Sequence, residues 1–119
     1  IGQSTRVEEG STLTRMAPHG GVESALWILV SMSAGFCEEV VYRGYLQRQL
    51  TALTRRPAAG ILLSALIFGV GHAYQGRRSV VVITAYGLLF GLLARITRSL
   101  RPGMIAHAGQ DVLSILFRI

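Results

Sequence analysis

Residues 22–46 read VESALWILVSMSAGFCEEVVYRGYL, an apolar stretch long enough to cross a membrane that carries charged residues in its second half. A helix needs about 20 mostly apolar residues to span the hydrocarbon core. An ionisable side chain inside such a helix is costly unless it is paired or faces a cavity. Glu38, Glu39 and Arg43 therefore mark this segment both as a membrane helix and as a candidate functional site.

Three further apolar segments follow, at about residues 58–74, 80–96 and 104–117. Half of the 119 residues are hydrophobic, which is high for a soluble domain of this size. Because backbone groups in lipid must be satisfied within their own segment, each segment should be a helix. The sequence therefore predicts an all-α fold, a polytopic transmembrane helical bundle of about four spans within residues 21–119. Residues 1–20 are polar and should form a tail or an interhelix loop.

The net charge of +6 reflects twelve basic residues, all arginine, most of which lie in the gaps between apolar segments. They form no stripe interleaved with aromatic residues, so the charge does not indicate nucleic-acid binding. The middle gap carries Arg77 and Arg78. The first and third gaps together carry more arginines: Arg48, Arg55, Arg56, Arg95, Arg98 and Arg101. By the positive-inside rule the richer side is predicted to be cytoplasmic, in an integral protein of a bacterial plasma membrane.

The single cysteine, Cys37, excludes an internal disulfide and gives no metal-ligand spacing, so we interpret it as a packed side chain. The chain begins at Ile1, and no basic region followed by an apolar run and a cleavage site indicates a signal peptide. We interpret the chain as a fragment or a processed product of a longer protein.

Polar residues recur in the other apolar segments at a spacing of four: Phe68 with His72, and His107 with Asp111. A helix rises ~1.5 Å per residue, so the acidic residues and histidines of these segments lie roughly 8 to 22 Å below the arginine-rich side of the membrane. Helix tilt and side-chain reach could close that spread, so one shared polar pocket inside the bilayer is feasible. A structural cluster that only joins helices is the alternative.

The two neighbouring glutamates should have different roles. Residues four apart lie on one face of a helix, so Glu39 and Arg43 are predicted to form an internal ion pair. Adjacent residues point about 100° apart, so Glu38 cannot aim at the same spot. Glu38 is therefore left as the free carboxylate.

These residues resemble the motifs of the CaaX-processing and bacteriocin-processing (CPBP, or Abi) intramembrane endopeptidases, a family that includes the type II CaaX prenyl proteases. The family has a double glutamate with a following arginine, then Phe-x-x-x-His, then His-x-x-x-Asn/Asp. Here these stand as Glu38-Glu39-Val40-Val41-Tyr42-Arg43, Phe68-Gly69-Val70-Gly71-His72 and His107-Ala108-Gly109-Gln110-Asp111. Three motifs in order on three apolar segments form a specific signal, which covers about residues 35–111.

The resemblance implies a glutamate-dependent protease that needs neither a metal nor another cofactor. Glu38, helped by His72, would activate a water to attack the scissile carbonyl. His107 with Asp111 would stabilise the oxyanion. Asp111 stands where asparagine is frequent, and an ionised aspartate donates no hydrogen bond, so it would act protonated or by orienting His107. The supporting residues would be Phe68 as pocket wall, Glu39 and Arg43.

The implied substrate is a peptide at the membrane lipid: a prenylated CaaX-type peptide, a bacteriocin leader or another membrane-associated peptide. Two alternatives stay open. The same fold could serve a non-catalytic immunity or scaffold protein that binds a peptide or a partner. Glu38, His72, His107 and Asp111 are also a plausible ligand set for zinc, which would make the protein a membrane metalloprotease. Because members of the family usually carry further helices, we interpret these segments as its catalytic core.

Overall fold

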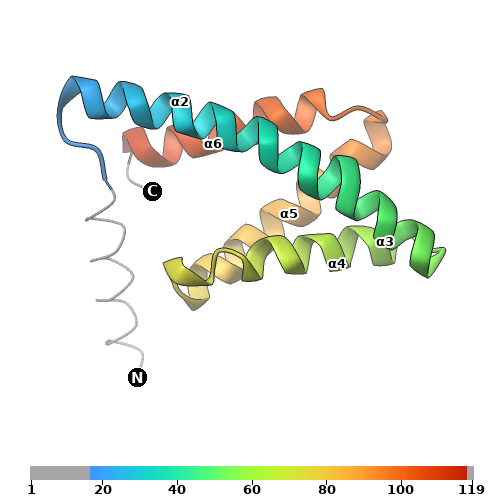
Figure 1. Ribbon diagram of the computed structural model, residues 1–119. Helices are drawn as coiled ribbons and strands as arrows, with labels where there is room; N and C mark the ends of the chain where they lie inside the picture. The colour runs from blue at the N-terminus through green and yellow to red at the C-terminus, as the bar shows by residue number, and fades with distance from the viewer. Residues whose placement is uncertain (1–16, 118–119) are drawn as a thin grey trace.

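The computed structural model describes residues 17–117, and within this range every regular element is a helix (Figure 1). The all-α prediction is confirmed. The first helix is continuous over Gly20–Thr54, and residues 1–16 of the predicted tail lie outside the described range. The elements are α2 (Gly20–Glu39), the π-helix η1 (Val40–Leu46), α3 (Gln47–Thr54), α4 (Pro57–Val70), the 3₁₀-helix η2 (Ala73–Gln75), α5 (Arg77–Thr97) and α6 (Arg101–Phe117).

The helices pack as two pairs that the first helix joins (Figure 1). α2 lies along α6, and α4 lies along α5. α3, which continues α2, packs on α4. η1 lies between them in the chain and touches both α4 and α5. The middle of the first helix is therefore the place where the two pairs meet.

The turns fall in the arginine-rich gaps for local reasons. Arg55 (φ 58°) and Arg98 (φ 54°) adopt the left-handed conformation that commonly ends a helix. Pro57 occupies the first turn of α4, where its missing N–H is not needed. Gly76 precedes α5 with a φ of 103°, a value that glycine adopts without steric cost.

The helices differ in length from the predicted segments. Gly20–Thr54 and Arg77–Thr97 are long and apolar enough to cross a membrane. α4 is apolar but ends at Val70 after 14 residues, short of the predicted limit at residue 74. Glycines on both sides of Val70 weaken the helix there, because glycine has low helix propensity. α6 has 17 residues, and the four-span bundle stays a prediction.

The distribution of side chains is the reverse of that in a soluble protein. Large apolar side chains face outward, and Leu29 and Val81, for example, are 62% and 70% exposed. The largest fully buried side chains are Arg43, Glu39 and Ser64. In lipid an apolar side chain gains little from burial, whereas a polar group must find a partner inside the protein. This distribution fits a chain whose surroundings are lipid.

Glycines allow the helices to approach closely. A Cβ on Gly35 of α2 would lie 2.7 Å from the backbone nitrogen of Ala108 in α6. A Cβ on Gly87 of α5 would lie 3.1 Å from the Cα of Ala65 in α4. Both helix pairs are therefore packed at backbone distance, which fixes the positions of the side chains between them.

Candidate active site

Glu38 and Glu39 end α2 directly before η1 and occupy different environments. The Glu39 side chain is fully buried, whereas 30% of the Glu38 side chain is exposed. Adjacent positions on a helix point about 100° apart, which explains the difference. Glu39 therefore belongs to the helix junction, and Glu38 is the carboxylate that solvent or a substrate can reach.

Glu39 makes two hydrogen bonds through one oxygen. Its Oε1 accepts from Nη1 of Arg43 at 3.0 Å, so the predicted ion pair is present. The same oxygen lies 2.9 Å from Nδ1 of His107, a contact that the sequence did not predict. Because a carboxylate only accepts hydrogen bonds, Nδ1 of His107 donates in this pair. Glu39 thus orients His107 as well as pairing with Arg43.

Arg43 is held by aromatic rings as well as by its ion pair. Its Cζ lies 4.4 Å from the centroid of the Phe68 ring and 5.5 Å from that of Phe90. Nε and Nη2 of Arg43 are buried and have no hydrogen-bond partner among residues 17–117. A desolvated guanidinium is attracted to the face of an aromatic ring. Phe68, predicted as a pocket wall, therefore also forms the surface on which Arg43 packs.

His72 lies just after the end of α4, at the start of η2, and not within a helix as its segment predicted. Its Nδ1 lies 2.8 Å from the carbonyl oxygen of Phe68, so Nδ1 donates. Its Nε2 lies 3.9 Å from Oε1 of Glu38. The ring packs edge-on against Phe68 with the centroids 4.9 Å apart. The bond to the Phe68 carbonyl thus turns Nε2 toward Glu38.

His107 is buried and stands at the centre of the cluster. Its Nε2 lies 3.1 Å from Oε2 of Glu38 and 3.5 Å from Oδ2 of Asp111, which is four residues further along α6. Phe90 of α5 stacks on its ring, with the centroids 5.0 Å apart and the planes at 18°. The structure thus brings residues of all three motifs into contact around one imidazole: Glu38, Glu39, Phe68, His72, His107 and Asp111. Their catalytic roles stay predictions.

Three supporting residues were not predicted from the sequence. Gln47 donates through Nε2 to the carbonyl of Gly91 at 3.1 Å. Ser64 donates to the carbonyl of Tyr42 at 2.9 Å, and Phe90 stacks on the central histidine. Of these three, only Gln47 could have been found from the sequence, because it belongs to a repeat of small or polar residues at every fourth position. The repeat comprises Ser31, Gly35, Glu39, Arg43 and Gln47.

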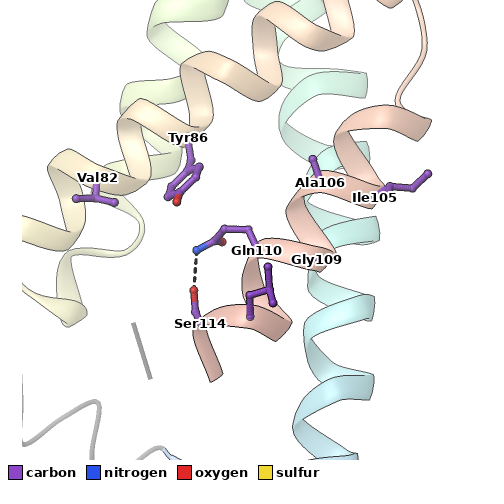
Figure 2. A pocket seen from close by; sticks show the side chains of 8 residues that line it. Val82, Tyr86, Ile105, Ala106, Gly109, Gln110 and Ser114 are labelled. Carbon is purple, nitrogen blue, oxygen red and sulfur yellow. Dashed lines mark hydrogen bonds between the residues drawn. The ribbon is translucent and has the colours of Figure 1, made fainter. Parts of the chain in front are cut away.

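A groove of about 460 Å³ opens between α5 and α6 beside this cluster (Figure 2). Its walls are mostly apolar, and its polar side chains are Tyr86 of α5 with Gln110 and Ser114 of α6. Gln110 donates to Oγ of Ser114 at 2.8 Å. Tyr86 stacks on Phe90 with the centroids 5.9 Å apart. Because Phe90 also stacks on His107, a series of stacked rings connects Tyr86 in the groove to the cluster.

Within residues 17–117, no group of three or more His, Cys, Asp or Glu side chains is placed to hold a metal ion. A zinc ligand must present a lone pair to the metal. Both ring nitrogens of His107 instead face carboxylate oxygens, those of Glu38 and Glu39. Two of the residues considered as zinc ligands, Glu38 and His107, are therefore paired with each other.

Comparison with known protein families matches most of the chain. The family model described as Type II CAAX prenyl endopeptidase Rce1-like matches residues 20–113. No curated protein and no solved structure matches the chain. The matched range begins with α2 and includes every residue of the cluster around His107.

Proposed function

The chain belongs to the Rce1-like family of type II CAAX prenyl endopeptidases, and from this premise we propose that it hydrolyses a peptide bond with a water activated by Glu38. Membership of this family makes it a membrane endopeptidase with a peptide substrate. The cluster supports a specific mechanism for that reaction. Glu38 is partly exposed and lies against both His72 and His107.

The observation that carries the proposal is the distance between Glu38 and His72. Oε1 and Nε2 lie 3.9 Å apart, too far for a direct hydrogen bond and close enough for one water to bond both. Because Nδ1 of His72 donates to a backbone carbonyl, Nε2 of the neutral ring accepts. A water that donates one hydrogen to each group directs its lone pairs away from them, toward a substrate carbonyl. Glu38 takes the proton as the water oxygen attacks.

His107 supplies the hydrogen bond to the oxyanion. In the resting arrangement its Nε2 donates to Glu38 at 3.1 Å. Once Glu38 has accepted the proton of the water, its carboxyl is a weaker acceptor, and the N–H, held in place by the bond from Nδ1 to Glu39, donates to the negative oxygen of the tetrahedral intermediate. Preorganised donors of this kind contribute about 10²–10³ in rate. Glu38 then passes its proton to the leaving amine, the C–N bond breaks, and the carboxylate is regenerated.

The proposed setting is a four-span bundle in a bacterial plasma membrane, with residues 21–119 as the catalytic core. The outward-facing apolar side chains support it, as do the turns at the predicted arginine-rich gaps. α4 is about 21 Å long at ~1.5 Å per residue, so it would span a locally thinned bilayer. We propose that the turns at Arg55 and Arg98, in the two richer gaps, are cytoplasmic. We also propose that the substrate is a membrane-associated peptide, such as a prenylated CaaX-type peptide or a bacteriocin leader.

Replacing Glu38 by Gln tests the mechanism. The full chain in lipid nanodiscs is assayed against a peptide library that contains prenylated and unprenylated members. We expect cleavage by the wild type and a loss of about 10³-fold in kcat for Glu38→Gln. The control is Glu23→Gln, which removes an exposed carboxylate from the first turn of the same helix. Undiminished cleavage by Glu38→Gln would contradict the mechanism, and a wild type that cleaves no peptide would favour the non-catalytic binding protein.

Chelation separates this mechanism from zinc-dependent hydrolysis. Prolonged incubation with 1,10-phenanthroline should leave the cleavage rate unchanged, and added zinc should not raise it. A rate that falls on chelation and returns with zinc would support the metalloprotease alternative.

A further inference from the structure

In the first helix, small or polar residues at every fourth position all lie on one buried face. A regular α-helix would spread these positions around its surface. In an α-helix each step of four residues drifts about 40° around the axis, so four steps amount to about 160°. A π-helix has i→i+5 hydrogen bonds and more than four residues per turn. A step of four residues therefore falls short of a full turn in a π-helix, whereas it exceeds a full turn in an α-helix. η1 therefore returns the second half of the repeat to the buried face. The buried positions are Ser31, Gly35, Glu39, Arg43 and Gln47.

The carbonyl oxygen of Tyr42, within η1, accepts two hydrogen bonds. One comes from the backbone N–H of Gln47, an i→i+5 bond of the π-helical turn. The other comes from Oγ of Ser64 in α4, at 2.9 Å. A serine within a helix commonly bonds the carbonyl four residues back in its own helix. Ser64, which is fully buried, instead reaches a different helix. It therefore ties the π-helical turn to α4.

The register of η1 decides which helices this face can bind. Glu39, just before η1, bonds His107 of α6. Gln47, just after η1, donates to the carbonyl of Gly91 in α5. In a regular α-helix these two positions would lie about 80° apart around the axis, so they could not make both contacts in the observed packing. The π-helical turn therefore lets one helix bond α6 and α5 at once.

We propose that Ser64 is a positioning residue for the peptidase reaction: its hydrogen bond holds η1, and η1 fixes the direction of Glu38 toward His72 and His107. The inference rests on the proposed function of Glu38. Ser64 bonds the backbone of η1 and not the proposed water or substrate. Its loss should therefore slow turnover and leave substrate affinity unchanged. A misplacement of about 1 Å at a reacting group can cost about 10²-fold in rate.

Kinetics of Ser64→Ala test the catalytic half of this proposal. We expect kcat to fall about ten-fold to hundred-fold with KM unchanged, as misplacement of Glu38 predicts. The matched control is Ser79→Ala, because the Ser79 hydroxyl bonds the carbonyl of Gln75, four residues back, at 3.2 Å and so makes a bond within its own segment. The control should keep the wild-type kcat. A folded Ser64→Ala protein with unchanged kcat, or with a raised KM as its main defect, would overturn the proposal.

The side-chain amide of Gln47 tests the structural half independently of activity. Its ¹⁵N NMR signal in nanodiscs reports the bond to Gly91, so it should shift in Ser64→Ala and stay in place in Ser79→Ala. An unmoved Gln47 signal in Ser64→Ala would show that Ser64 does not hold the turn, whatever the kinetics. If the wild type cleaves no peptide, the proposed function fails, and the Gln47 signal still decides whether Ser64 holds η1.

Discussion

The close contact between α2 and α6 allows a test of whether the proposed reaction depends on the distance between Glu38 and His107. Gly35→Ala would place a Cβ 2.7 Å from the backbone nitrogen and 2.9 Å from the Cα of Ala108. Because these are backbone atoms within a helix, they cannot rotate away as the end of a side chain can. Ordinary contacts begin at 3.4 Å, so the two helices must separate locally by about 0.7 Å.

This separation acts on the distance between Glu38 and His107, which lie on the two helices that move apart. The 3.1 Å between Oε2 and Nε2 would open to about 3.8 Å, beyond hydrogen-bond range. A displacement of this size should lower kcat/KM by about 10²-fold. That loss corresponds to about 2.7 kcal/mol of transition-state stabilisation.

The assay compares kcat/KM on one cleaved peptide with thermal unfolding of the same nanodisc samples. Gly21→Ala is the control, because it lies on the same helix and its Cβ would meet nothing within 4 Å. We expect it to keep kcat/KM and to unfold at the same or a higher temperature, since alanine favours helix over glycine. A folded Gly35→Ala protein with wild-type kcat/KM would refute the reasoning, because the distance between the carboxylate and the imidazole would then not limit the reaction.

Three further substitutions test other contacts. Arg43→Met should lower the free energy of unfolding by about 3–5 kcal/mol, measured by denaturation in micelles, because it removes the guanidinium that pairs with the buried carboxylate of Glu39. Asp111→Asn should keep kcat/KM within about ten-fold, because its contact with His107 is long, at 3.5 Å. Gly91→Ala should lower the free energy of unfolding by about 1 kcal/mol in the same denaturation assay. Its Cβ would lie 2.6 Å from Oε1 of Gln47 and so displace the side-chain amide that donates to the carbonyl of residue 91.

The candidate site could be found from the sequence because lipid makes its residues improbable. An ionisable group in an apolar segment needs a partner, and the spacing of Glu39 and Arg43 within one helix was enough to pair them. The contact of Glu39 with His107 could not be predicted in this way. It depends on the rotation and depth of two helices relative to each other, which spacing along either one does not determine.

Two local features also escaped prediction, for different reasons. Apolarity extended the second segment to residue 74, but the helix ends at Val70, so His72 sits in a turn. Hydropathy measures how well residues tolerate lipid and is insensitive to the low helix propensity of glycine. The π-helix cannot be recognised from the amino-acid composition of its segment. Only the repeat of small or polar residues at every fourth position of the first helix indicates it.

The place of His107 in the chain has a consequence for synthesis of the protein. α6 follows α2, α4 and α5 in sequence, and it brings the ring that both glutamates contact. A ribosome adds about 5–20 residues per second, so Glu38 and His72 emerge seconds before the helix that completes their cluster. During that interval the nascent chain holds the proposed water-binding pair without the proposed oxyanion donor, His107. On the proposed mechanism, the chain would therefore cleave no peptide before α6 docks on α2.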